Sequence, residues 1–178
     1  MPTMYLFGSA APPVLQVAPI ITDLRGRGWD VCLGLTPTAA DWLRDDLRGL
    51  EELTGHPVRS HYKRPGEADA WPKADVILFA PVTANSLNQW ALCLTSSFVV
   101  GVVAEGIGKR IPIVAMPCVN AAYAAHPQIE RSVDTLRAAG VTVLYGDGGF
   151  IPNQPGEKRD YPWELALAAA EAKAFEGR

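Results

Sequence analysis

Residues 76–86 read Val-Ile-Leu-Phe-Ala-Pro-Val-Thr-Ala-Asn-Ser, and residues 113–120 read Ile-Val-Ala-Met-Pro-Cys-Val-Asn. Each stretch begins with a short apolar run, reaches a proline and continues into small or polar residues. This pattern is typical of a buried parallel strand that delivers a loop to the edge of a sheet. Because ligands of open α/β sheets bind beyond the carboxyl ends of the strands, we expect the functional site at residues 80–86 and 117–120.

Apolar strand-like runs alternate with helical patterns along the whole chain. The strands are expected at 5–7, 30–35, 76–80, 113–116 and 141–144, and the helices at about 14–27, 38–50, 85–95, 129–139 and 162–176. This alternation predicts a three-layer α/β/α fold, with a Rossmann-like (flavodoxin-like) parallel sheet. Residues 57–60 are read as a short strand, and periodicity does not decide between helix and strand for 98–103.

Length and composition fit a single domain over residues 1–178. Of its 178 residues, 48% are hydrophobic and 20% charged, and the net charge of −3 leaves no basic stripe for nucleic acid. No apolar run is long enough to span a membrane, and the first residues lack a signal-peptide pattern. The three cysteines show no metal-ligand spacing, so we expect reduced thiols, no bound metal and a cytoplasmic location.

Two further segments are candidates for function. The Gly8-Ser9 turn after the first strand would present backbone N–H groups to an anion such as a phosphate, although many such turns bind nothing. Thr38 would either cap the second helix or give its hydroxyl to the same phosphate. Residues 146–161 are too rich in glycine and proline for regular structure, and we interpret them as a flap before the last helix.

The two quoted motifs resemble those of one enzyme family. Pro81-Val-Thr-Ala-Asn-Ser is similar to the Pro-Ala-Ser-Ala-Asn-Thr motif of the homo-oligomeric flavin-containing cysteine decarboxylases. Pro117-Cys-Val-Asn-Ala-Ala-Tyr resembles their substrate motif, Pro-x-Met-Asn-x-x-Met, and His126-Pro127 follows where members often have His-Pro or Asn-Pro. The family includes phosphopantothenoylcysteine decarboxylase and the decarboxylases of C-terminal cysteines in ribosomal peptides.

The resemblance implies a flavin site with assigned residues. The phosphate and ribityl chain of FMN would be held by Gly8, Ser9, Ala10, Thr36 and Thr38, and the isoalloxazine by Pro81, Thr83, Ala84 and Asn85. Asn120 would bind the substrate carboxylate, beside Pro117, Val119 and Tyr123. It further implies oxidative decarboxylation of a C-terminal peptidyl cysteine to an aminoenethiol, with Asn85 and Asn120 as catalytic residues.

The chain departs from the family at the catalytic histidine. Members place it eight residues before the Asp of a Trp-Ala-Asp sequence. The matching triplet here is Lys73-Ala74-Asp75, and Glu67 stands eight residues before Asp75. His61 in the same loop is the other candidate for this role.

Several alternatives stay open at this point. Asn85 and Asn120 could simply cap the helices that follow them, and Cys118 could be a buried structural thiol. His126 is interpreted as a turn residue. The alternative functions are a phosphopantothenoylcysteine decarboxylase-like enzyme, a non-decarboxylating FMN-binding protein and a flavin prenyltransferase relative.

The assembly expected from the resemblance is a homotrimer or a multiple of it, such as a dodecamer. Family members build the flavin site at a subunit interface. The sequence adds a reason of its own, since apolar residues occupy more than one face of the segment after Asn85: Leu87, Trp90, Leu92, Phe98 and Val99.

Overall fold

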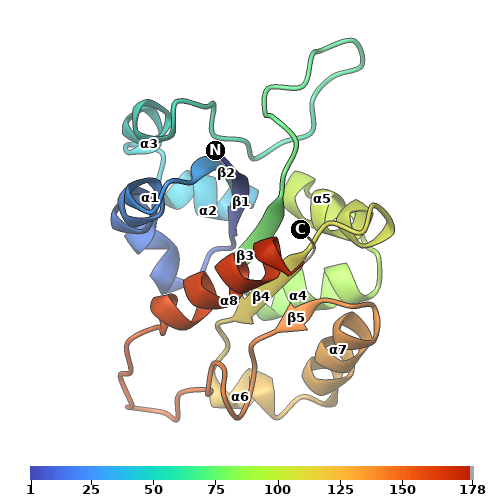
Figure 1. The fold of residues 1–178 in the computed structure, drawn as a ribbon. Helices are drawn as coiled ribbons and strands as arrows, with labels where there is room; N and C mark the ends of the chain where they lie inside the picture. The colour runs from blue at the N-terminus through green and yellow to red at the C-terminus, as the bar shows by residue number, and fades with distance from the viewer. Residues whose placement is uncertain (177–178) are drawn as a thin grey trace.

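All five strands of the sheet run parallel, in the order β2-β1-β3-β4-β5. The computed structural model describes residues 1–176 (Figure 1). Its strands are β1 (Thr3–Gly8), β2 (Asp30–Leu35), β3 (Val76–Val82), β4 (Ile113–Pro117) and β5 (Thr142–Val143). The chain steps from β1 to β2 on one side and then returns to β3 on the other. This reversal between β1 and β3 is where doubly wound sheets open a crevice for ligands.

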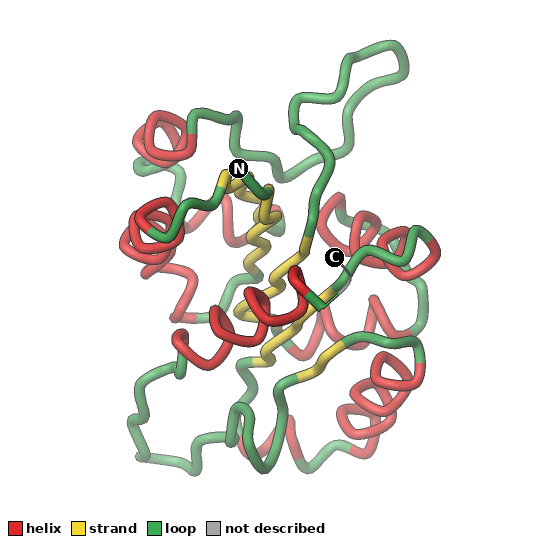
Figure 2. Tube along the Cα trace, viewed as in Figure 1, coloured by secondary structure: helices red, strands yellow, loops and turns green. Residues whose placement is uncertain are grey.

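Helices cover both faces of the sheet, as the alternating pattern predicted (Figures 1 and 2). One side carries the 3-10 helix η1 and four α-helices: η1 (Pro12–Gln16), α1 (Val17–Gly26), α2 (Pro37–Trp42), α3 (Leu47–Thr54) and α8 (Trp163–Phe175). The other side carries α4 (Ala84–Ala91), α5 (Phe98–Gly108) and α7 (Pro127–Ala138), and the single turn α6 (Ala121–Ala124) follows β4. No helix among residues 1–176 is long and apolar enough to cross a membrane.

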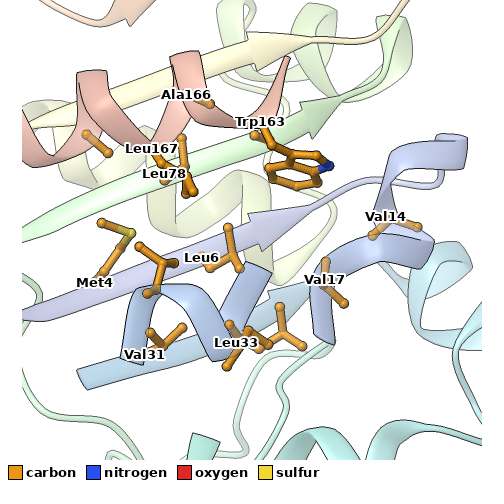
Figure 3. Close-up of a cluster of buried hydrophobic side chains, with 14 of the residues drawn as sticks. Met4, Leu6, Val14, Val17, Val31, Leu33, Leu78, Trp163, Ala166 and Leu167 are labelled. Atoms are coloured by element: carbon orange, nitrogen blue, oxygen red, sulfur yellow. The ribbon is translucent and has the colours of Figure 1, made fainter. Parts of the chain in front are cut away.

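The larger core cluster joins α8 and α1 to the sheet. Figure 3 shows Ala166 and Leu167 of α8 facing Leu78, with Leu6 and Met4 on the neighbouring strand. Alternate residues of a strand point to opposite faces, so Phe7 and Phe79 instead join the cluster under α4, α5 and α7. The small side chains of α8 allow it to cross closely over β3 and β4.

Some expected elements begin or end elsewhere. The first helix is divided into η1 and α1, each with proline in its first turn, where a missing N–H costs nothing. The second is broken between α2 and α3, at residues 43–46, where two aspartates favour turn conformations. Residues 98–103 belong to a helix, and 57–60 form only an isolated bridge of Arg59 with Gly34. The helix after Thr83 ends at Ala91, shortly before Cys93, whose φ is 56°.

A long connection, residues 55–75, covers the β2–β1 part of the second face in place of a helix. Trp71 anchors it, because its indole is buried and donates a hydrogen bond to the Pro57 carbonyl at 2.9 Å. The Tyr62 hydroxyl donates to the Thr95 carbonyl at 2.8 Å. Residues 61–70 are exposed throughout, and this stretch projects from the body of the subunit (Figure 2).

Gly34 provides a test of this packing. A Cβ at Gly34 would lie 2.5 Å from the Phe7 ring, whereas one at Gly49 in α3 would meet nothing within 4 Å. We expect Gly34→Ala to lower the free energy of unfolding by about 1–3 kcal/mol, because a rigid ring must move. Gly49→Ala, the matched control, should raise it by about 0.5–1 kcal/mol. Urea denaturation measures both, and equal effects would contradict the packing described.

Candidate functional site

A cavity of about 750 Å³ opens at the carboxyl ends of β1, β3 and β4. It lies at the edge of the sheet where the two quoted motifs end. Its lining combines apolar groups with polar side chains, four of which are amides: Ala10, Ala11, Pro12, Thr83, Ala84, Asn85, Asn88, Cys118, Val119, Asn120, Tyr123, His126, Ile129, Phe150 and Asn153. The size and the mixture of apolar walls with a few polar groups are typical of a cofactor or ligand site.

A buried set of hydroxyl groups holds the turn after β1 against the start of α4. The Ser9 hydroxyl donates to Ser86 Oγ at 3.0 Å, and Thr83 Oγ1 lies 3.3 Å from both the hydroxyl oxygen and the backbone nitrogen of Ser86. Thr83 is therefore the N-cap of α4. The alternative that Asn85 caps this helix is wrong, and its side chain lies at the wall of the cavity instead.

Asn120 does cap the helix that follows it. Its Oδ1 accepts a hydrogen bond from the backbone N–H of Tyr123 at 2.8 Å. This bond identifies the other amide atom as nitrogen, because a backbone N–H requires an acceptor. The Nδ2 group remains a donor beside the cavity. Capping and carboxylate binding thus use different atoms of the same amide and are compatible.

Sequence reasoning missed Asn153, which lies in the segment interpreted as a flap. Its backbone carbonyl accepts a hydrogen bond from Ala121 N at 3.1 Å, which ties the segment to Asn120 and α6. The Asn153 Oδ1 atom is buried without a hydrogen-bond partner among the described residues. A buried acceptor in a cavity wall calls for a donor from a ligand or water. Asparagine in a glycine- and proline-rich segment looks like a turn residue, so the sequence offered no signal for it.

His126 lines the cavity as well as starting a helix. Its Nδ1 accepts a hydrogen bond from the backbone N–H of Gln128 at 3.1 Å, so it is the N-cap of α7. The turn role expected for it is confirmed. Because Nδ1 accepts, the proton of the neutral ring belongs on Nε2. In this arrangement the Nε2–H group of His126 is the donor left for a ligand. The nitrogen that could accept a proton, Nδ1, is already bonded within the cap.

The remaining polar groups near the cavity do not ionise easily. Burial raises the pKa of the Cys118 thiol to about 11. Tyr161 stands behind it, donating its hydroxyl to the Met116 carbonyl at 2.5 Å, and burial raises the pKa of Tyr161 well above its usual value. No Asp, Glu, Lys or Arg appears among the described residues that line the cavity. Amide groups and helix ends therefore dominate its electrostatics.

Twelve of the residues predicted for the site stand at or next to the cavity, and Thr38, His61 and Glu67 do not. Seven line the cavity: Ala10, Thr83, Ala84, Asn85, Val119, Asn120 and Tyr123. Five stand at the same edge, buried in the strand ends behind the lining or in the turns that follow them: Gly8, Ser9, Thr36, Pro81 and Pro117. Thr38 is exposed in the first turn of α2, where Thr36 rather than Thr38 occupies the N-cap position, so the capping prediction for Thr38 is wrong.

Gly8 has a packing role that the sequence did not reveal. A Cβ there would lie 2.8 Å from Val14 Cγ2, so glycine lets η1 close onto the end of β1. Its carbonyl accepts a hydrogen bond from Thr36 N at 3.0 Å, which joins the ends of β1 and β2.

His61 and Glu67 do not line the cavity. Both are exposed in the projecting part of the 55–75 connection, where the His61 ring contacts Ser60 Oγ and Glu67 accepts from Arg64 N. This connection leads into the amino end of β3 (Figure 1). The cavity is lined by residues that follow the carboxyl end of β3. Within one subunit, neither side chain can serve as a base in this cavity.

A sequence model of the family described as Flavoprotein matches residues 3–172. The chain belongs to this family. Membership indicates a flavin cofactor.

Solved structures share the fold over nearly the whole chain. The FMN-dependent cysteine decarboxylase SpaF is 23% identical with a TM-score of 0.72, covering 97% of each chain. TvaF, from thioviridamide biosynthesis, is 20% identical with a TM-score of 0.77, covering 98% of each chain. The peptidyl-cysteine decarboxylase EpiD is 18% identical with a TM-score of 0.73, covering 96% of this chain and 99% of EpiD. Because the sequences are only 18–23% identical, the structural similarity establishes the fold alone.

A curated relative matches part of the sequence. The coenzyme A biosynthesis bifunctional protein CoaBC of Thermococcus kodakarensis is 28% identical over 102 residues. The match covers 53% of this chain and 25% of CoaBC, so the chain corresponds to about a quarter of that protein's length.

The cavity residues fit a flavin on structural grounds. A flavin ring offers N–H and carbonyl groups, which match the amides of Asn85, Asn120 and the unpartnered Asn153 Oδ1. The N-terminus of α4, beginning at Ala84, directs its partial positive charge to the same space. The lining contains no carboxylate that would repel a phosphate.

The pKa shift of Cys118 gives a testable order of reactivity. Only the thiolate reacts with iodoacetamide, and a pKa of about 11 leaves Cys118 almost wholly protonated at pH 7.5. We expect the exposed Cys93 to be alkylated first, and Cys118 to react roughly tenfold faster per pH unit up to pH 10. Peptide mass spectrometry across a pH series measures both. Faster labelling of Cys118 than of Cys93 at pH 7.5 would contradict this account of the cavity wall.

Proposed function

We propose that the cavity binds FMN and that the chain oxidatively decarboxylates a C-terminal peptidyl cysteine to an aminoenethiol. The observation that carries the proposal is that Asn85 and Asn120, from two separate motifs, line one cavity at the β1/β3 reversal. That position is the ligand crevice of doubly wound sheets, including those that hold FMN. The solved structures that share this fold include enzymes named as FMN-dependent cysteine decarboxylases, which supports the same reading.

The residues proposed to hold FMN fall into two groups by position. The turn after β1, with Ala10, would bind the phosphate through backbone N–H groups, supported from behind by Gly8, Ser9, Thr36 and, more remotely, the exposed Thr38. The loop after β3, with Pro81, Thr83, Ala84 and Asn85, would lie along the ring system. When bound, FMN would supply the hydride acceptor, taking two electrons with one proton, that decarboxylation of cysteine otherwise lacks.

Asn120 is proposed to orient the substrate. Asn120 lines the cavity and its Oδ1 holds the cap of α6, so its Nδ2 donor has a fixed direction before substrate arrives. A neutral amide binds a carboxylate without the strong ion pair that would resist loss of CO₂. Val119 and Tyr123 border the same space, and Pro117 ends β4 behind them.

The proton of the substrate thiol has no base to receive it within one subunit. His126 already uses Nδ1 as an acceptor, and Cys118 and Tyr161 are held protonated by burial. Cysteine is a few per cent thiolate at neutral pH, and we propose that this fraction reacts. The rate should then rise with pH toward the thiol pKa, roughly 8.5. A histidine-like break near pH 6.5 would instead point to a histidine base, either His126 in the cavity wall or His61 delivered by a neighbouring subunit.

We propose a homotrimer or a multiple of it as the working assembly. The surface argument for it needs correction, since Leu87, Trp90, Phe98 and Val99 are all buried within the subunit. The structure leaves Leu92 and the nearby Leu94 exposed, at 58% and 55%. A neighbouring subunit could also place its projecting 61–70 segment, with His61 and Glu67, at this cavity. The 61–70 segment of the same subunit does not reach it.

A second candidate is decarboxylation of a small N-acylated cysteine such as phosphopantothenoylcysteine. The match to part of CoaBC favours it. Against it, residues 119–178 contain no cysteine that could return electrons to the product. That absence favours an enethiol product over a saturated thiol.

The experiment begins with the purified full chain. We expect a yellow protein with about one FMN per subunit, sedimenting as a trimer or a multiple of it. Incubation with peptides ending in cysteine should remove CO₂ and two hydrogens, seen by mass spectrometry, and bleach the flavin without oxygen. A colourless protein that cannot be reconstituted with FMN would reject the flavin site. A bound flavin with no mass change in peptide or phosphopantothenoylcysteine would instead favour a non-decarboxylating flavoprotein or a prenyltransferase relative.

Two substitutions distinguish the two roles proposed for Asn120, which are capping α6 and donating a hydrogen bond to the substrate carboxylate. Asn120→Asp keeps an oxygen for the cap of α6 but removes the Nδ2 donor. It should fold with normal stability and bind FMN, yet lose about 1.5–3 kcal/mol of substrate binding, roughly 10- to 150-fold in kcat/KM.

Asn120→Ala should lose the same activity and also about 1 kcal/mol of stability, because the cap is gone. Asn85→Ala should weaken FMN binding and turnover together. Normal turnover in Asn120→Asp would return Asn120 to a purely capping role.

A further inference from the structure

Away from the cavity, three side chains of types that can bind a metal ion meet beside the edge strand β2. Asp30, Cys32 and His56 each offer one ligand atom, and these atoms all lie within 4.8 Å of one another. No sequence motif indicates this group, because 24 positions separate Cys32 from His56. Asp30 and Cys32 point to the same face of β2, being two residues apart. His56 reaches them from the start of the 55–75 connection, directly after the last turn of α3.

We infer that Asp30, Cys32 and His56 form a binding site for Zn²⁺. Zinc binds thiolate, imidazole and carboxylate together, with bonds of about 2.0–2.3 Å that set its ligand atoms roughly 3.3–3.8 Å apart. His56 Nε2 and Asp30 Oδ1 stand 2.8 Å apart, so the pair has only to open by a fraction of an ångström to admit the ion. The side chains of both residues are 21% exposed, which leaves a path for the ion and room for water as a fourth ligand.

Neighbouring groups hold these ligands in place. The Thr3 hydroxyl approaches Asp30 Oδ2 at 3.5 Å, which leaves Oδ1 turned toward His56. The buried Thr54 hydroxyl accepts from the His56 backbone N–H at 3.2 Å, and its own proton is within reach of the Leu50 carbonyl at 2.9 Å and the His56 carbonyl at 3.0 Å. Supporting contacts of this kind orient metal ligands and strengthen binding.

The charges of the three ligands also suit a divalent cation. A Zn²⁺ ion bound to one thiolate, one carboxylate and one neutral imidazole would leave the site with no net charge.

The position of the site indicates a structural role. Asp30 begins β2 at the amino edge of the sheet, whereas the cavity lies at the carboxyl edge. A metal there would fasten the 55–75 connection, which carries His61 and Glu67, to the edge strand. This inference is independent of the proposed decarboxylation.

The test uses the full chain, stripped with EDTA and given one equivalent of zinc chloride before gel filtration. We expect about one zinc per chain by elemental analysis and a higher melting temperature. Cobalt(II) in place of zinc should show thiolate charge-transfer absorption and ligand-field bands at wavelengths beyond those of a flavin. His56→Gln should weaken binding beyond the roughly 10- to 100-fold that loss of a supporting residue costs.

Cys93→Ser, which removes the exposed cysteine, is the matched control and should bind zinc normally. Asp30→Asn and His56→Gln test the partly exposed ligands in case Cys32→Ala fails to fold. Failure to retain zinc would overturn the inference and leave Asp30 and His56 as a hydrogen-bonded pair. Equal zinc binding in His56→Gln, or a cobalt spectrum without thiolate absorption, would also overturn it.

Discussion

The burial of β3 constrains the rest of the structure. All seven of its residues are buried, with β1 and β4 paired on either side and helices on both faces. Parallel pairing brings the carboxyl ends of these three strands to one edge of the sheet. The loops that follow them must therefore meet, and the cavity is the space that they enclose. A break in the pairing of β3 would separate Asn85 from Asn120.

Short polar links fix the positions of the cavity groups once the strands are paired. The buried contact between Ser9 and Ser86 ties the first loop to the second, and the bond from Ala121 N to the Asn153 carbonyl ties the third to the flap segment. Three α-helices beside the cavity, α4, α6 and α7, are capped by residues of its wall: Thr83, Asn120 and His126. Because capping consumes one atom of each side chain, it also decides which atom is left for a ligand.

The cavity and the projecting segment each carry part of what the proposed reaction uses. The cavity positions donors and acceptors, but its histidine, His126, uses Nδ1 to cap α7. The projecting segment carries His61 and Glu67, which do not line the cavity of their own subunit. An assembly that joins the two would supply a base to each cavity. A subunit acting alone would depend on substrate thiolate.

The sequence by itself determined the sheet, its parallel strands and the edge where the cavity lies, because apolar runs that end at proline and small polar residues report burial and strand ends locally. The tertiary structure alone decided which polar residues face the cavity. Asn85 and Asn120 looked alike in the sequence, yet one is free and the other caps a helix, since capping depends on the backbone around it. Asn153, and the meeting of Asp30, Cys32 and His56, arise from contacts between distant segments, which no local pattern encodes.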